Sequence, residues 1–218
     1  MKKIHKKPAF TMIELVLVIV VLGILAALAI PRLDRDRSQE AADMILSNIR
    51  YTQHMAISDF REDPRNNKWQ ESFWQIKIES CGSSSGLFLQ VGSDKDNGGD
   101  IDKSEAAIDP FNGKPMFWKN TDDCSNGGDG TVSENIFITK KFGVSSISGS
   151  GGCNGIQHIG FDHMGRPHVS FSSSTTPDYS SYMSSQCNFT FAIEGDNNFT
   201  IIIEPETGYA YISDQNAS

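Results

Sequence analysis

The chain has 218 residues and carries 27 acidic against 19 basic residues, for a formal net charge of −8. Hydrophobic residues make up 38% and charged residues 21%, which excludes a multi-pass membrane protein and a fully disordered chain. The acidic balance also argues against a protein that coats nucleic acid, because such proteins need a cationic surface. Four lysines stand among the first seven residues, and without them 15 basic residues would remain, for a net charge of −12.

Residues 10–30 form a long apolar run directly after those lysines. As a helix this run would be about 31 Å long, which matches the hydrocarbon core of a membrane. Basic residues before such a helix place its N-terminus in the cytoplasm. A cleavable secretory signal is the alternative, since Ala27-Leu28-Ala29 has the form of a cleavage site. The run is longer than the usual apolar core of a signal peptide, however, and it contains Glu14, a carboxylate that normally needs a partner in a membrane.

The residues around this carboxylate carry a family resemblance. The string Lys6-Lys7-Pro8-Ala9-Phe10-Thr11-Met12-Ile13-Glu14-Leu15 resembles the class III leader and N-terminus of type IV pilins and pseudopilins. The resemblance implies that a prepilin peptidase cuts between Ala9 and Phe10 and methylates the new amine of Phe10. It also implies that Glu14 pairs with such an amine on a neighbouring subunit during assembly. Ala9 departs from the family pattern, in which most members have glycine before the cut.

The chain after the apolar run is expected to continue as a helix. Ala42, Ile45, Ile49, Ala56 and Phe60 fall near one helical stripe, and breaker residues follow at 64–67. The pilin resemblance gives such a helix a membrane half and a periplasmic half. The expected division is a leader peptide at 1–9, a transmembrane helix at 10–30, its periplasmic continuation at 31–64 and a globular β-rich domain at 65–218.

Short segments with alternating apolar residues dominate the sequence from Trp69 onward. The expected strands are 74–78, 87–91, 136–139, 156–161, 169–171, 189–193, 200–204 and 209–212. Turn residues join the last three, which predicts an antiparallel meander. The Ser- and Gly-rich stretches 145–152 and 170–185 are expected to be exposed loops. The fold class is therefore α+β, with a long N-terminal helix followed by an antiparallel, sandwich-like β-rich domain.

Two further strings are similar to the minor pseudopilin GspH and its type IV pilus relative FimT. They are residues 161–167, Phe-Asp-His-Met-Gly-Arg-Pro, and the terminal stretch 201–212. The resemblance implies a β-sandwich of two sheets after the helix. Some FimT-like proteins bind DNA through basic residues just after the terminal Thr-Gly, but residues 209–218 contain no lysine or arginine. This departure argues against nucleic acid as a partner.

Four cysteines stand in the region expected outside the cytoplasm. They are Cys81, Cys124, Cys153 and Cys187. An even count in that compartment indicates disulfides, and four cysteines allow three connectivities. We favour the pairing of sequence neighbours, Cys81 with Cys124 and Cys153 with Cys187. The absence of a C-x-x-C spacing argues against zinc-ribbon and thioredoxin-like sites.

An acidic segment at 94–105 partly matches the calcium-binding loop pattern. Asp94, Asp96, Gly99 and Glu105 occupy its positions one, three, six and twelve. The other candidate ligands, at positions seven and nine, are Asp100 and Asp102. Position five is a glycine and supplies no side-chain ligand, so we expect weak binding, with Kd about 10⁻⁴ to 10⁻³ M. The alternative interpretation is a solvated acidic turn.

No catalytic pattern stands out. His158, His163 and His168 recur every five residues, a spacing that places strand side chains on alternating faces, so we expect ordinary surface or turn histidines rather than a metal site. The sequence has no nucleophile elbow and no phosphate-binding glycine loop. We therefore expect a protein that is not an enzyme and requires no cofactor, with calcium as the one candidate.

The resemblances imply a minor pilin-like subunit of a periplasmic pseudopilus for type II protein secretion. Its partners would be other pseudopilins or minor pilins, the prepilin peptidase and the inner-membrane assembly platform. Its location would be the inner membrane, as a single-pass protein with a cytoplasmic N-terminus and a periplasmic domain. One alternative is a minor pilin of a type IV pilus or DNA-uptake system, and another is a calcium-dependent surface adhesin delivered by the same route.

Overall fold

The computed structural model describes residues 11–63, 65–82, 86–171 and 176–213, with the side chains of 28–36 excepted. The chain forms two compact units, Met1–Arg37 and Ser38–Ser218. Helix α1 (Met12–Ser58) contributes residues to both. The second unit contains the remaining helices and all the described strands.

In the first unit, the side chains described along α1 are exposed from residue 12 to residue 27. They are almost all large and apolar, and Leu15, Ile19 and Leu25 each have 58% of their surface exposed. Over the described residues, no helix is both long and apolar enough to cross a membrane.

In the second unit, α1 buries one stripe. Ala42, Ile45, Ile49 and Ala56 are at most 2% exposed, so the apolar periodicity predicts the buried face correctly. The helix ends at Ser58, however, and not near residue 64. The Ser58 hydroxyl donates to the carbonyl of His54 at 2.8 Å, a local hydrogen bond typical of serine at the end of a helix. Phe60 therefore lies beyond the helix, and 64% of its surface is exposed.

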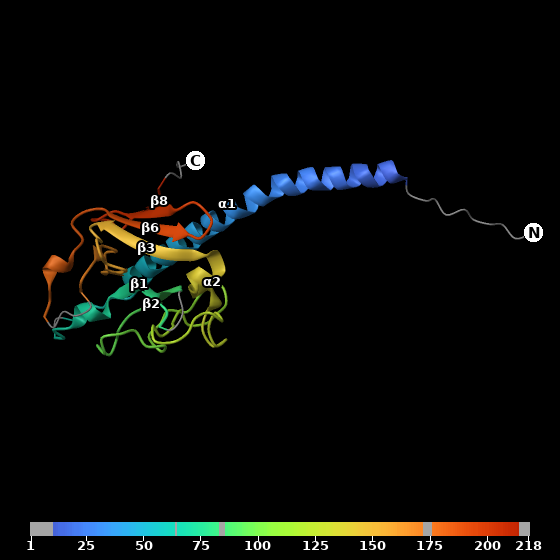
Figure 1. Cartoon of the computed structure of the whole chain (residues 1–218). Helices are drawn as coiled ribbons and strands as arrows, with labels where there is room; N and C mark the ends of the chain where they lie inside the picture. Colours follow the sequence, from blue (N-terminus) through green and yellow to red (C-terminus); the bar gives the residue numbers. More distant parts are fainter. Residues whose placement is uncertain (1–10, 64, 83–85, 172–175, 214–218) are drawn as a thin grey trace, which may run out of the picture. The chain divides into compact units, whose positions relative to one another are not determined.

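Two antiparallel sheets complete the second unit (Figure 1). The first contains, in order, β2 (Leu87–Gly92), β1 (Trp74–Ser80), β4 (His158–Phe161) and β5 (Pro167–His168). The second contains, in order, β3 (Val144–Gly151), β6 (Cys187–Ile193), β7 (Phe199–Ile203) and β8 (Ala210–Ile212). Strands β6, β7 and β8 pair consecutively, as the predicted meander requires. An α+β fold with a helix before antiparallel sheets is therefore confirmed.

Three local predictions are wrong. Residues 136–139 run from the end of η2 (Glu134–Ile136) into α2 (Ile138–Phe142) instead of forming a strand. Ser133 caps the first of these turns, and Gly143, with φ of 75°, ends the second. The expected loop at 145–152 is largely strand β3, which owes its conformation to pairing with β6 rather than to its serines and glycines. Residues 169–171 do not form the expected strand: β5 lies just before them, at Pro167–His168, and the positive φ of Ser170 interrupts an extended conformation.

The core of the second unit lies among α1 and the inward faces of the two sheets. Its largest fully buried side chains include Phe88, Phe137, Phe142, Phe161 and Phe191. The short helices η1 (Trp69–Ser72) and η3 (Tyr179–Ser181) carry further buried residues.

Two disulfides connect this core. They join Cys81 to Cys124 and Cys153 to Cys187, the pairing of sequence neighbours that the sequence analysis favours. The second bridge starts just after β3 and reaches the residue that pairs with the last residue of that strand. It therefore ties the loop after β3 to the start of β6.

Candidate functional site

The expected processing site lies at the start of the chain. Ala9 and Phe10 are outside the described residues, and the described chain begins one residue later, at Thr11. Thr11 Oγ1 accepts a hydrogen bond from the backbone N–H of Glu14 at 3.4 Å, and Glu14 Oε2 accepts one from the N–H of Thr11 at 3.5 Å. This reciprocal arrangement is a capping box, which satisfies backbone donors at the first turn of a helix.

The capping box places the Glu14 carboxylate beside the peptide group that joins Thr11 to Phe10. If the chain is cut before Phe10, the new α-amine belongs to the residue directly before Thr11, whose N–H the Glu14 carboxylate accepts. Glu14 can therefore act in two ways, as a helix cap within its own chain and as a negative charge for an amine. The two roles differ in one requirement, because only the second needs the charge.

The comparisons with known proteins bear on this N-terminal segment. A family model described as the prokaryotic N-terminal methylation motif matches residues 4–30. No curated protein and no solved structure matches the chain. The motif match supports a type IV pilin-like protein. The motif implies processing by a prepilin peptidase, a membrane-anchored N-terminus and assembly with other pilins.

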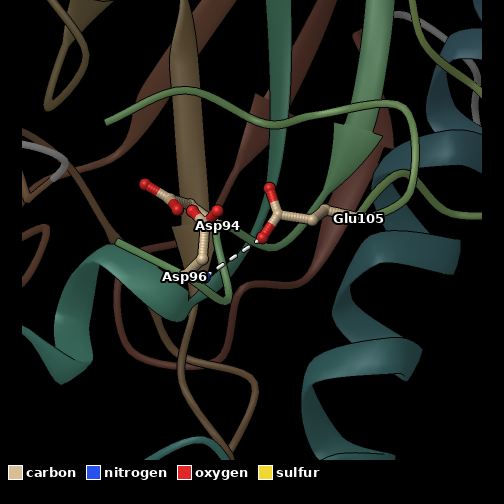
Figure 2. Close-up of side chains that lie close together, drawn as sticks. All are labelled: Asp94, Asp96 and Glu105. Carbon is tan, nitrogen blue, oxygen red and sulfur yellow. Dashed lines mark hydrogen bonds between the residues drawn. The ribbon is translucent and has the colours of Figure 1, made fainter. Parts of the chain in front are cut away.

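The acidic segment after β2 forms a second candidate site. Asp94, Asp96 and Glu105 each offer an oxygen within a group whose members all lie within 4.8 Å of one another. Figure 2 shows the three carboxylates converging from the two ends of the loop. Asp94 and Glu105 are buried and Asp96 is exposed. The structure thus brings together three of the five expected calcium ligands.

Backbone N–H groups already use these carboxylates. Asp94 accepts from the N–H groups of Gly98 and Gly99 at 2.9 and 2.8 Å. Glu105 accepts from Lys95 at 2.7 Å, from Asp96 at 3.1 Å and from a third backbone N–H across the loop. Burial and the neighbouring charge of Glu105 raise the pKa of Asp94, while the two glycine N–H groups oppose the rise. Ionisation of Asp94 is therefore less favourable in the folded loop, an effect that a bound cation would offset.

The other two expected ligands lie apart from this group. Asp100 has 91% of its side chain exposed and forms an ion pair with Lys77, at 3.6 Å. Asp102 donates its backbone N–H to Glu105 at 3.0 Å, and it lines, with Asp100 and Glu79, a separate hollow. The five residues therefore do not form one ligand set in this conformation.

The three converging carboxylates provide only oxygen donors, which suit Ca²⁺, but calcium takes six to eight oxygens and would need carbonyls or water as well. We propose that they hold calcium weakly. With Kd near 10⁻³ M, 10 mM calcium should raise the free energy of unfolding by about 1.4 kcal/mol. Thermal melting in calcium and in chelator measures this rise. Glu105→Gln should abolish the stabilisation by calcium. Glu134→Gln, which changes an exposed glutamate elsewhere, should leave it unchanged. Identical melting of the unaltered protein in both buffers would refute the calcium site.

A third polar site, centred on Asp162, escapes the sequence analysis. Asp162 is 2% exposed, and Oδ1 accepts the backbone N–H groups of Met164 and Arg166, both at 2.9 Å. Oδ2 accepts the Arg166 side chain at 2.7 Å and lies 3.5 Å from His168 Nε2. Gly165, with φ of 78°, allows the tight turn that brings these groups together.

His168 extends this network to a serine. Its Nδ1 lies 2.9 Å from Ser181 Oγ, so an aspartate, a histidine and a serine are in series. Ser181 is only 3% exposed, and its hydroxyl donates to the carbonyl of Asp178 at 2.8 Å. A substrate could not approach the hydroxyl in this conformation, so the network serves to hold η3 against β5. The prediction that His168 is a surface or turn residue is wrong, since it is 7% exposed.

The other two histidines lie elsewhere. His163 Nδ1 contacts Glu62 at 2.7 Å and its ring packs edge-on against Phe60. His158 is half-buried on β4, where burial and the charge of Lys77 lower its pKa. The three histidines do not share a ligand site among the described residues.

The Asp162 network gives a pH-dependent prediction. Burial opposes ionisation, but hydrogen bonds from His168, Arg166 and Met164 outweigh it and hold the pKa of Asp162 well below its usual range. A lowered carboxylate pKa stabilises the fold above the unfolded pKa, near 4, and the contribution is lost as the pH falls toward the folded value. Asp162→Asn should therefore lower the free energy of unfolding by about 3 kcal/mol at pH 7.

Urea unfolding at pH 7 and pH 3 measures this effect. The difference between Asp162→Asn and the unaltered protein should shrink at the lower pH. Asp63→Asn provides the control, because Asp63 also has a lowered pKa, through Arg65, but both groups lie in solvent. A difference that is the same at both pH values would show that the charge of Asp162 contributes nothing.

Proposed function

We propose that this chain is a minor pseudopilin of the GspH type, which assembles into or primes a periplasmic pseudopilus for type II protein secretion. The observation that carries the proposal is the methylation motif at residues 4–30 on a chain whose helix α1 begins within the motif and precedes an antiparallel β domain. The strings at 161–167 and 201–212, which resemble GspH and FimT, support the finer assignment.

The two strings also lie close together in the second unit. Gln53 on α1 donates through Nε2 to the carbonyl of Gly165 at 2.8 Å and to that of Thr207 at 2.9 Å. A Cβ added to Gly208 would lie 2.3 Å from the Gly165 carbonyl oxygen, so only glycine fits there. The two strings thus contact each other and the same residue of α1. This shared contact is a reason for both strings to occur together in one family.

The proposal gives the apolar part of α1 a role. Before assembly it anchors the subunit in the inner membrane, with the lysine-rich leader in the cytoplasm and the second unit in the periplasm. In the filament the same apolar surface packs against other helices. The proposed activity is thus assembly with other pseudopilins on an inner-membrane platform, and not catalysis.

The processing step provides the first test. Intact-mass analysis of the protein extracted from membranes should give a chain that starts at Phe10 and carries one added methyl group. A chain that starts at Ile30, just after Ala27-Leu28-Ala29, would identify a secreted protein with an ordinary signal peptide and would refute the proposal.

The assembly step provides the second test, through Glu14. Glu14→Gln keeps a side chain that can complete the capping box but removes the charge. If Glu14 pairs with an α-amine in the filament, Glu14→Gln should still insert in the membrane and be cleaved, yet co-purify with other subunits at least about tenfold less. Glu14→Val should behave in the same way, and Thr11→Ala, which removes only the cap, should assemble. Normal assembly of Glu14→Gln would leave capping as the role of Glu14.

The second candidate is a minor pilin of a type IV pilus or DNA-uptake machine. The same N-terminal motif favours it, but the processed chain would have a net charge of −12 and no basic residue among 209–218. A phosphate backbone is a poor partner for such a surface.

A further inference from the structure

A groove in the second unit lies outside all the sites described above. It has a volume of about 550 Å³ and is formed by α1, the turn at 109–113 and the η2–α2 segment. Its lining includes three apolar residues, of which Phe142 is buried, Met44 is half-buried and Phe111 is exposed. The groove therefore combines a sheltered apolar surface with an aromatic side chain that is free to contact a partner.

Phe111 is exposed but firmly held. Its side chain has 86% of its surface exposed. The backbone beneath it is fixed by Asp109, which is 3% exposed and accepts the N–H of Phe111 at 2.9 Å and the side chain of Asn135 at 2.8 Å. Ser133 donates a further hydrogen bond to the same carboxylate. A large aromatic side chain on a rigid turn loses little conformational freedom on binding, which is typical of interface anchors.

The lining is strongly acidic. Glu40 and Asp43 from α1 and Glu134 from η2 are exposed carboxylates. Among the described residues, no salt bridge engages any of the three. Lys141, the only basic residue among the described lining residues, donates to Asn135 at 2.6 Å. The groove thus offers negative charge beside apolar surface and has little positive charge of its own.

We propose that this groove receives a segment of a neighbouring pilin-like subunit in which a lysine or arginine stands beside a large apolar side chain. The apolar side chain would pack against Phe111 and Met44, and the cation would lie between the carboxylates of Glu40 and Asp43. Charge complementarity of this kind selects a partner and fixes its register. The inference rests on the proposed function, since it presupposes assembly with other subunits.

The place of the groove in the sequence of α1 favours a subunit over an exported protein. Glu40 and Asp43, which line the groove, belong to the same helix as Ala27 and the residues before it. Residues 12–27 form the exposed apolar stretch that the proposed function packs against other subunits. One helix therefore carries both the proposed assembly surface and one wall of the groove, so a subunit that packs on this helix is the expected occupant.

Photocrosslinking in the native membrane tests the proposal. The full-length chain would carry p-benzoylphenylalanine in place of Phe111, and a matched control would carry it in place of Tyr179, which is 81% exposed and outside the groove lining. The Phe111 probe should give a product with another pilin-like subunit, and peptide mass spectrometry should locate the crosslink next to a lysine or arginine.

Charge reversal separates docking from chance proximity. Glu40→Lys together with Asp43→Lys should reduce the crosslinked product about tenfold, while Glu206→Lys, a reversal of an exposed residue outside the lining, should leave it unchanged. Both sites are exposed, so the melting temperature should stay the same and serves as a check on folding.

Where crosslinked products form, three results would overturn the proposal. They are an equal yield from the Tyr179 probe, a yield unaffected by the charge reversal, and a crosslink to an exported protein instead of a subunit. Absence of any product from a chain that starts at Phe10 and co-purifies with other subunits would refute the docking groove and leave the proposed function intact. A chain that is not cleaved before Phe10 would refute the proposed function itself.

Discussion

Helix α1 passes through two different environments along its length, one that leaves its side chains exposed and one that buries a single face. From residue 12 to 27 the described side chains of α1 are exposed and mostly apolar on every side. From Ala41 to Ala56 the apolar residues fall on one stripe, which is buried in the core of the second unit. A helix satisfies its backbone hydrogen bonds internally, so it can tolerate such a change of environment without a break. Only the side-chain pattern has to change.

The same contrast explains which parts of the fold the sequence predicts. The stripe of α1 and the strands β1, β2, β6, β7 and β8 have strong apolar periodicity, and all of them are found where expected. Strand β3 consists largely of serine and glycine and depends on long-range pairing with β6, which no local pattern reveals. Residues 136–139 fail for the opposite reason, because their apolar run is compatible with either a strand or a short helix.

For the candidate sites too, local sequence patterns predict only part of the arrangement. Spacing along the sequence brings Asp94, Asp96 and Glu105 together correctly, since the loop that joins them is short. It does not foresee that backbone N–H groups use those oxygens, or that Asp100 turns out to solvent and pairs with Lys77. A sequence motif identifies the candidate ligand residues, but it does not show which of their oxygens already accept hydrogen bonds from the backbone. The Asp162 network is harder still to foresee, because Ser181 and His168 become neighbours only through packing of η3 on β5.

These polar networks share one physical principle, which also bears on assembly. Asp162, Asp109 and Glu105 are buried carboxylates, and each one organises a turn by accepting backbone N–H groups. Their charges are thus stabilised by hydrogen bonds within the domain. Three other carboxylates, of Glu40, Asp43 and Glu134, are exposed at the groove. Among the described residues, they form no salt bridge. In an acidic chain, free carboxylates repel one another and are costly to gather on one face unless a cation neutralises them. Gathering them beside an exposed phenylalanine is therefore an arrangement whose free energy improves when a basic partner docks.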